Sequence, residues 1–269
     1  MSDTVLVDRD GGVAIVTLNR PERLNAIDTE LMNYLPGVLR GLADDPDVGC
    51  VVLTGAGRGF CAGGDLKSRQ AELDAQALLS EEERRLLAMP YVGDVGLRAK
   101  VEASRLLHEM QKPTIAMVNG PCAGAGFSMA GACDLRFAGE SAVFTSAFTR
   151  AGLSGDFGGT WFWTQILGTA QARELYLLSE RITAAQALAR GMVTRVLPDA
   201  DLREATLEVA RAMADGPRWA YAYAKRNLNA ALDCPLERVL QSEIITMGNA
   251  TRTTREAGRL PSSVLAKSA

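Results

Sequence analysis

Three turns rich in small residues are the part of the sequence whose residue types could do chemistry. The first lies in Pro113–Asp134, PTIAMVNGPCAGAGFSMAGACD, where the apolar run Thr114–Val118 meets a turn and Gly124–Gly126 leads into an expected helix. A junction of strand, small-residue turn and helix start directs free backbone N–H groups at an anion. Small residues also favour a tight, well-packed turn without a ligand, so this stretch alone leaves both interpretations open.

The other two turns add further N–H groups and a carboxylate. Phe60–Leu66, FCAGGDL, follows a glycine-rich loop, and Asp65 stands where a helix would begin, while Gly152–Trp161, GLSGDFGGTW, contains Asp156. Two N–H groups from two such turns form an oxyanion site, which stabilises negative charge on a carbonyl oxygen, as in a thioester enolate. Enolate chemistry also needs a base or proton shuttle near the substrate carbons, and Asp156 is the best candidate in the chain. Its alternative interpretation is a helix N-cap or an ordinary turn aspartate.

The spacing of apolar residues predicts the elements that hold these turns. Strands are expected at residues 5–7, 13–18, 48–53, 114–118, 135–138, 142–145 and 193–196. Helices are expected after the N-caps Asp28 and Thr183, and at residues 101–111, 160–167, 170–179 and 199–258. The charged residues 69–91 predict a mobile or helical excursion outside the core. Alternating strands and helices followed by helices alone predict an α/β fold, with a core domain at residues 1–198 and a C-terminal helical region at residues 199–269.

The composition is typical of a soluble globular protein and excludes several partners. The chain has 269 residues, 47% of them hydrophobic and 23% charged, with a net charge of −3. It has no basic arm for nucleic acid or an anionic membrane surface, and no apolar run of the roughly 20 residues that a membrane span needs. The N-terminal residues lack the features of a signal peptide, and the five cysteines form no Cys-x-x-Cys pair. We therefore expect a cytoplasmic protein with mostly buried, reduced thiols.

Metal sites and histidine-based triads are almost excluded by the histidine content. His108 is the single histidine of the chain, and it falls in the expected helix at residues 101–111. We expect it to pack or to lie at the surface and not to act as a catalyst.

Four motifs together resemble the enoyl-CoA hydratase/isomerase (crotonase) family. They are Asn19–Ala26, NRPERLNA; Gly59–Leu66, GFCAGGDL; Asn119–Gly126, NGPCAGAG; and Gly152–Trp161. They follow the order and spacing of that family over roughly residues 5 to 200. The resemblance implies a spiral of ββα repeats followed by C-terminal helices, packed as a homotrimer or homohexamer. It also implies an acyl-CoA thioester substrate and no metal or redox cofactor, because coenzyme A is part of the substrate.

The same resemblance assigns roles to individual residues. The two oxyanion N–H groups would be those of Gly64 and Ala125. The two glutamates that hold the catalytic water in hydratases of the family correspond to Ser128 and Phe148 here, so both carboxylates are missing. Asp156 falls where some isomerases of the family keep a catalytic aspartate. The surrounding residues look especially like those of the family's 1,2-epoxyphenylacetyl-CoA isomerases.

Further residues are expected to bind the substrate. Arg23 and Leu24 resemble residues that line the groove for the CoA nucleotide, and Lys67 and Lys100 are weaker candidates for its phosphates. Asp65 is expected to cap its helix or pair with a cation, and Trp161 to pack at the floor of the acyl pocket. The full set expected in the substrate site is completed by Ala62, Gly63, Leu66, Gly124, Ser128 and Phe148.

The leading hypothesis is an acyl-CoA isomerase with Asp156 as its single proton shuttle. Two alternatives stay open: an enoyl-CoA hydratase that uses Asp156 alone, and an acyl-CoA-binding member without catalysis. The acyl group itself is expected to be selected by side chains at about residues 69–95.

Overall fold

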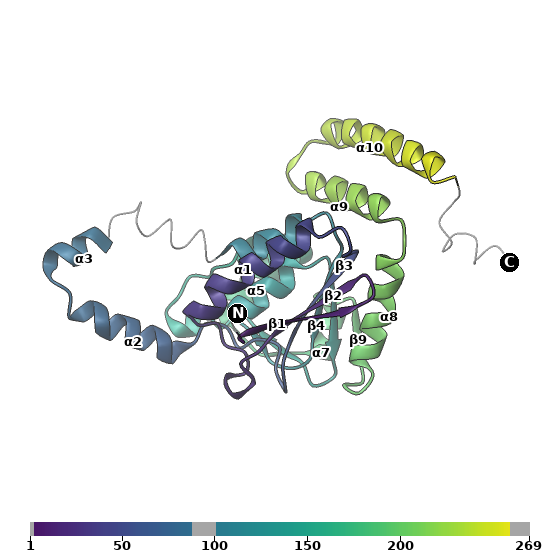
Figure 1. Cartoon of the computed structure of the whole chain (residues 1–269). Coiled ribbons are helices and arrows are strands. Elements are labelled where there is room, and N and C mark those ends of the chain that lie inside the picture. Colours follow the sequence, from purple (N-terminus) through teal and green to yellow (C-terminus); the bar gives the residue numbers. More distant parts are fainter. Residues whose placement is uncertain (1–2, 88–100, 259–269) are drawn as a thin grey trace.

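A six-stranded sheet forms the centre of the molecule in the computed structural model, which describes residues 3–87 and 101–258 (Figure 1). Its strand order is β1-β2-β3-β4-β6-β9, and only β1 runs antiparallel to its neighbour. The strands are β1 Val5–Asp10, β2 Val13–Leu18, β3 Cys50–Gly55, β4 Thr114–Val118, β6 Leu135–Gly139 and β9 Arg195–Leu197. Six of the seven strands predicted from the apolar runs are in this sheet, and the seventh, predicted at residues 142–145, is in a second, smaller sheet.

The central strands are covered on both faces, which explains why they read as continuous apolar runs. In β2, Ala14 and Val16 face a large core that includes helix α1 (Thr29–Asp44), while Val13 and Ile15 face a smaller core that includes helix α8 (Leu202–Ala214). Alternation of side chains along the strand produces this division.

A second, three-stranded sheet is formed by short strands that lie between strands of the large sheet in the sequence. It contains β5 Cys122–Ala123, β7 Val143–Thr145 and β8 Ile182–Thr183, in the order β5-β7-β8. Isolated parallel bridges join Ile27 to Gly64 and Cys61 to Cys122. The chain therefore winds between two sheets before it enters the C-terminal helices, which confirms the predicted α/β spiral.

The helices agree with the predicted periodicity in most places. Their bounds are α1 Thr29–Asp44, α2 Leu66–Ala77, α3 Glu81–Leu87, α5 Ala125–Ala132, α6 Gly159–Leu178, α7 Ala184–Ala189, α8 Leu202–Ala214, α9 Arg218–Asp233 and α10 Leu236–Glu256, with residues 101–109 also helical and short 3₁₀ turns at Pro21–Arg23 and Thr149–Ala151. Asp28 caps α1, and Thr183 forms a capping box at α7, as predicted. Helix α6 is kinked at Gly168, where the sequence predicted a break between two helices.

Helices α2 and α3 project away from the core (Figure 1), in agreement with the predicted excursion. The part of that excursion beyond Leu87 lies outside the described residues. None of the helices in the described ranges combines the length and apolar character needed to cross a membrane.

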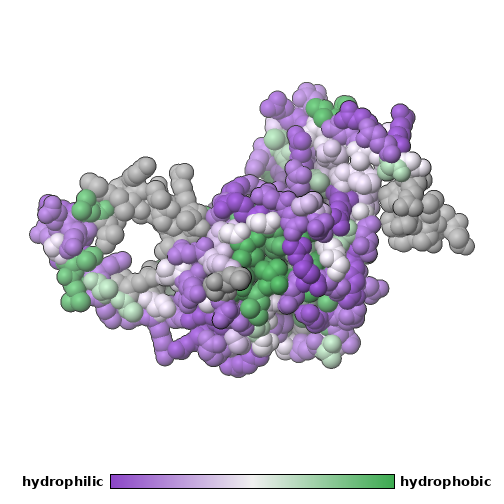
Figure 2. Space-filling model, viewed as in Figure 1, coloured by the Kyte–Doolittle hydropathy of each residue, from purple (hydrophilic) through white to green (hydrophobic). Residues whose placement is uncertain are grey.

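The C-terminal helices are attached in two different ways. Helix α8 packs against the sheet through Leu202, Leu207 and Ala210, so it completes the smaller core although it lies beyond residue 198. Helices α9 and α10 pack against each other at one end of the molecule (Figure 1), joined by hydrogen bonds from Asn227 to Thr246 and from Ser242 to Asn227. Figure 2 shows apolar side chains at the surface of these helices.

Four of the five cysteines are buried, and Cys234, between α9 and α10, is exposed. Burial raises the pKa of Cys50, Cys61 and Cys133 to about 12 and that of Cys122 well above its usual value. The expectation of mostly buried, reduced thiols is confirmed.

Candidate active site

A cavity of about 430 Å³ lies where the three small-residue turns meet. Gly64, Ala125 and Asp156, the three residues expected to do the chemistry, all line it. Of the residues expected to bind substrate, six also line it: Ala62, Gly63, Asp65, Leu66, Gly124 and Phe148.

Backbone pairing with Ile27 fixes the direction of the Gly64 N–H group. The Ile27 N–H group donates to the Gly63 carbonyl at 2.7 Å, and the Asp65 N–H group donates to the Ile27 carbonyl at 2.9 Å. Because C=O and N–H point in opposite directions across a trans peptide, the Gly64 N–H group points away from Ile27. Gly64 also faces open space, since a Cβ atom there would meet no atom within 4 Å.

The N-terminus of α5 fixes the direction of the Ala125 N–H group. The Gly124 carbonyl accepts the Ser128 N–H group at 3.0 Å, so the Ala125 N–H group in the same peptide points out of the helix end. The N-cap residue Gly124 has no side chain to occupy that end. Helices α1 and α2, which also border the cavity, are instead capped by the side chains of Asp28 and Asp65. The positive end of the α5 dipole is therefore left for a ligand.

The two turns touch each other through their glycines. A Cβ atom on Gly63 would lie 3.4 Å from the Gly124 Cα atom, and one on Gly124 would lie 3.3 Å from the Gly63 Cα atom. Both glycines have positive φ angles, +92° and +52°, which other residues rarely adopt. The Ala123 N–H group donates to the Cys61 carbonyl at 2.8 Å and locks the turns together. The amides of Gly64 and Ala125 thus lie on adjoining turns of one cavity, an arrangement that can bind a single oxyanion.

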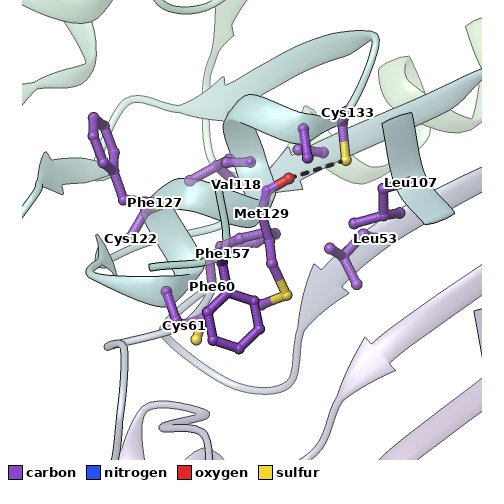
Figure 3. Close-up of a cluster of buried hydrophobic side chains, with 14 of the residues drawn as sticks. Leu53, Phe60, Cys61, Leu107, Val118, Cys122, Phe127, Met129, Cys133 and Phe157 are labelled. Carbon is purple, nitrogen blue, oxygen red and sulfur yellow. Dashed lines mark hydrogen bonds between the residues drawn. The ribbon is translucent and has the colours of Figure 1, made fainter. Parts of the chain in front are cut away.

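Buried side chains pack behind the turns that carry Gly64 and Ala125, on the core side. Figure 3 shows Phe60 and Cys61 of the Phe60–Leu66 turn gathered with Cys122, Phe127 and Met129 from the segment that carries α5. All five belong to the larger core and are fully buried. The turns therefore rest on a closely packed base and can hold their amides in a fixed orientation.

Replacement of Gly126 by alanine tests how tightly the turns must pack. A Cβ atom at Gly126 would lie 2.5 Å from the Cys61 Cβ atom and 2.6 Å from the Cys61 carbonyl oxygen. We expect Gly126→Ala to lower the free energy of unfolding by roughly 1–3 kcal/mol, measured by urea denaturation, because the two turns must separate. Gly41→Ala in α1 is the matched control, since its Cβ atom would meet no atom within 4 Å and should stabilise the helix. Equal stability of Gly126→Ala and the wild type would contradict the close contact.

Asp156 lies on the loop that enters α6 and is exposed at the cavity. Positive φ angles at Gly155, Phe157 and Gly158 shape this loop. The N-cap of α6 is Gly158, with no side-chain cap, so the alternative role of Asp156 as that N-cap is wrong. Burial raises the pKa of Tyr176, and the negative charge of Asp156 raises it further.

The two positions that the family resemblance assigns to hydratase glutamates have different surroundings. Ser128 is fully buried in α5, and its Oγ atom donates to the Gly124 carbonyl at 3.3 Å. Phe148 lines the cavity and stacks on Tyr176, with ring centroids 6.0 Å apart and planes 8° apart. One position thus lies behind the turn, and the other gives the cavity an aromatic wall.

Asp65 has the structural role predicted for it. Its carboxylate accepts the N–H groups of Lys67 and Ser68 at 3.1 and 3.3 Å and lies 3.0 Å from the Arg20 guanidinium. Burial alone would raise its pKa, but the bonds from Arg20 and the two amides outweigh burial, so the pKa is lowered. Asp65 is therefore ionised near neutral pH.

Four residues expected at the substrate site do not line the cavity. Leu24 instead holds the Phe60–Leu66 turn, because its carbonyl accepts the Ala62 N–H group at 2.9 Å. Trp161 packs edge-on against His108, with ring centroids 5.3 Å apart, since α6 turns this side chain away from the cavity. Arg23 and Ser128 are the other two, and Lys67, the weaker candidate for the phosphates, does not line the cavity either. Lys100 lies outside the described residues.

His108 is half-buried between Trp161 and Phe162. Burial lowers its pKa, and it does not line the cavity. This is the packing role that the sequence predicted.

Sequence patterns did not indicate several residues that line the cavity. They are Ile27, Met32, Ala147, Arg150, Leu153 and Phe157. Ile27 and Met32 come from the entrance of α1, and the others flank Asp156 in the chain. The residues near Asp156 could have been found from their position in the sequence. Ile27 and Met32 could be placed at the cavity only once the bridge between Ile27 and Gly64 was known.

Comparisons with known proteins agree on one family. The family model described as enoyl-CoA hydratase/isomerase matches residues 8–260. The 1,2-epoxyphenylacetyl-CoA isomerase of Escherichia coli (strain K12) is 36% identical over 243 residues, which cover 90% of this chain and 88% of that protein. A probable enoyl-CoA hydratase of Rhodobacter capsulatus is 34% identical over 246 residues, covering 91% and 88%.

Solved structures give the same result. The crystal structure of an enoyl-CoA hydratase from Bacillus anthracis matches with a TM-score of 0.82 at 27% identity, covering 96% of this chain and 98% of the other. A monofunctional enoyl CoA isomerase from M. smegmatis matches with a TM-score of 0.71 at 34% identity, covering 89% and 99%. Hydratases and isomerases thus both occur among the similar proteins.

Proposed function

The chain belongs to the enoyl-CoA hydratase/isomerase family, and on that premise we propose that it is an acyl-CoA isomerase with one carboxylate as proton shuttle. The main support for this proposal is the set of carboxylates that line the cavity. Among the described lining residues the carboxylates are Asp28, Asp65 and Asp156, and no glutamate is present. Asp28 and Asp65 cap helices and pair with Arg20, whereas Asp156 lines the cavity from the loop before α6, whose N-cap is Gly158.

In the proposed reaction, the thioester oxygen accepts hydrogen bonds from the N–H groups of Gly64 and Ala125. The Asp156 carboxylate removes a proton from one substrate carbon, and the electron pair of that C–H bond moves toward the thioester, whose oxygen becomes negative. The two amides stabilise this enolate more strongly than the neutral thioester, which lowers the barrier. The Asp156 carboxyl group then returns the proton to another carbon, and the double bond moves without any change in composition.

The substitutions at the two glutamate positions favour isomerisation over hydration. A buried serine and a phenylalanine cannot hold and deprotonate a water molecule as a pair of carboxylates does. A single carboxylate is sufficient to move a proton between two carbons. The aromatic wall that Phe148 provides would also suit a planar or aryl acyl group.

Turnover of a panel of CoA thioesters tests the proposal. The panel contains 2-enoyl-CoA, 3-enoyl-CoA and aryl-acetyl-CoA substrates, including 1,2-epoxyphenylacetyl-CoA, and the products are separated by chromatography and weighed by mass spectrometry. Isomerisation gives a product of new retention time and unchanged mass. Addition of water to a 2-enoyl-CoA would identify a hydratase instead, and binding without turnover of any substrate would identify a non-catalytic acyl-CoA-binding protein.

The proposed reaction needs no metal ion and no redox cofactor, because two amides and a carboxylate perform every step. Coenzyme A takes part as the carrier of the acyl group. The proposed binding partner is therefore the substrate, an acyl-CoA thioester, and the proposed reaction involves neither nucleic acid nor a membrane. A cytoplasmic location stays a prediction from the sequence.

A homotrimer or homohexamer, with α9 and α10 at the contact, is part of the proposal. These helices expose apolar side chains in unusual number: Leu228, Leu236, Leu240, Ile244, Ile245 and Met247 (Figure 2). Large apolar side chains exposed on one pair of helices are typical of a surface that another chain covers. Sedimentation velocity measures the assembly directly, and a monomer at micromolar concentration would contradict it.

A further inference from the structure

Arg20 joins the two helix N-caps that border the cavity. Its Nε atom lies 3.2 Å from Asp28 Oδ2, and its Nη2 atom lies 3.0 Å from Asp65 Oδ2. Its Nη1 atom donates to the Ala26 carbonyl at 2.5 Å. Between 10% and 20% of each of the three charged side chains is exposed, so solvent screens these pairs only partly.

The two carboxylates occupy matched places beside the Gly64 turn. Ile27 and Gly64 form a parallel bridge, Asp28 directly follows Ile27, and Asp65 directly follows Gly64. The Arg20 guanidinium therefore holds Asp28 on one strand of the bridge and Asp65 on the other. The two hydrogen bonds that orient the Gly64 peptide are those of this bridge.

A buried asparagine holds Arg20 itself in place. The Arg20 N–H group donates to Asn25 Oδ1 at 2.9 Å, and Asn25 Nδ2 donates to the Ala56 and Gly59 carbonyls at 2.9 and 2.7 Å. These hydrogen bonds fix the backbone of Arg20, from which the guanidinium extends. Its planar fork can contact two carboxylates at once, which the point charge of a lysine cannot do equally well.

We propose that Arg20 is a positioning residue that keeps the Gly64 N–H group aimed into the cavity by holding Asp28 and Asp65 together. Without the guanidinium, two partly buried carboxylates repel each other across the bridge between Ile27 and Gly64. The bridge then loosens, and the peptide that carries the Gly64 N–H group loses its fixed direction. The catalytic consequence rests on the proposed function, whereas the loosening of the bridge does not.

Hydrogen exchange tests the loosening of the bridge independently of any activity. Arg20→Gln and Arg20→Lys are compared with the wild type by exchange and mass spectrometry, following peptides that contain the Ile27 and Asp65 N–H groups. Both groups should exchange at least about tenfold faster in Arg20→Gln, and to an intermediate degree in Arg20→Lys. Arg40→Gln is the matched control, because it breaks an exposed ion pair with Glu102 outside the cavity and should leave both groups protected. Unchanged exchange in a folded Arg20 variant overturns the inference.

Enolisation of bound acetoacetyl-CoA tests the catalytic consequence. The enolate of this β-ketothioester absorbs in the near ultraviolet, so a pH titration gives the apparent pKa of the bound ligand. We expect Arg20→Gln to raise that pKa by about one unit and to lower kcat about tenfold, with little change in KM, because one of two oxyanion donors is misaligned. An unshifted pKa overturns the catalytic part of the inference. If wild-type protein does not enolise acetoacetyl-CoA, the proposed function fails, and the exchange experiment still decides the role of Arg20.

Arg20→Lys keeps the test decisive where Arg20→Gln does not fold. It retains a positive charge that can pair with one carboxylate, and it should show smaller shifts in the same directions. Wild-type exchange and a wild-type enolate pKa in folded Arg20→Lys overturn the proposal.

Discussion

Replacement of Asp156 by asparagine should lower kcat for isomerisation by roughly 10²- to 10⁴-fold. Asparagine keeps the size of the side chain but cannot accept and return a proton at neutral pH. Since the other cavity carboxylates in the described chain, Asp28 and Asp65, are bound to Arg20 and to helix N-termini, neither can replace Asp156. The measurement is steady-state kinetics on the substrate that the CoA thioester panel identifies.

The fold should survive this substitution. Asp156 is exposed and does not cap α6, so thermal unfolding should match that of the wild type. Asp201→Asn is the control, because Asp201 is also exposed and also makes no side-chain cap. Binding of acetoacetyl-CoA should persist, since the two amides remain. Isomerisation at the wild-type rate in Asp156→Asn would end the proposed mechanism.

Replacement of Lys225 by methionine should lower the free energy of unfolding by roughly 3–5 kcal/mol. The Nζ atom of Lys225, in α9, donates to the carbonyls of Leu107 and Lys112 at 3.0 and 3.2 Å and to Asp134 at 2.8 Å. Only 8% of the lysine side chain is exposed, and Asp134 also accepts two hydrogen bonds from Thr114. Methionine would fill the space but leave the Asp134 carboxylate without its cation, and the carbonyls of Leu107 and Lys112 would each lose the hydrogen bond from the ammonium group.

Urea denaturation at one protein concentration measures this loss. The double variant Lys225→Met/Asp134→Asn should recover part of it, because the unpaired carboxylate is then neutral. Arg85→Met is the exposed counterpart: Arg85 and Glu81 are both 80% exposed, so its loss should cost less than about 1 kcal/mol. If Lys225→Met were no more damaging than Arg85→Met, the ion pair would not be what attaches α9.

The core and the three turns could be predicted from sequence because their signals are local. Apolar runs located the strands, and small residues followed by a helix start located the Gly64 and Ala125 turns. Asp28 and Thr183 were identifiable as caps for the same reason. The cavity contacts of Gly64, Ala125 and Asp156 follow from the order of those turns along parallel strands.

The remainder depends on contacts between distant segments. Ile27 lines the cavity because it pairs with Gly64, and Arg20 is significant because it reaches Asp28 and Asp65. Neither relation produces a pattern within a window of sequence. Trp161 shows the opposite case: its position beside Asp156 suggested the cavity, but rotation along α6 brings it against His108. The kink at Gly168 is local and was predicted, whereas the attachment of α9 by Lys225 was not.

Because only one of the five cysteines is exposed, a spectroscopic dye can be attached at a single position. Cys50, Cys61, Cys122 and Cys133 are sealed in the core as neutral thiols, so a maleimide dye under native conditions should react at Cys234 alone. That residue lies in the short connection between α9 and α10, away from the cavity. If the proposed trimer or hexamer forms, donor and acceptor dyes placed there in separate preparations would report exchange of its subunits by energy transfer, in unmutated protein and at a residue that does not line the cavity.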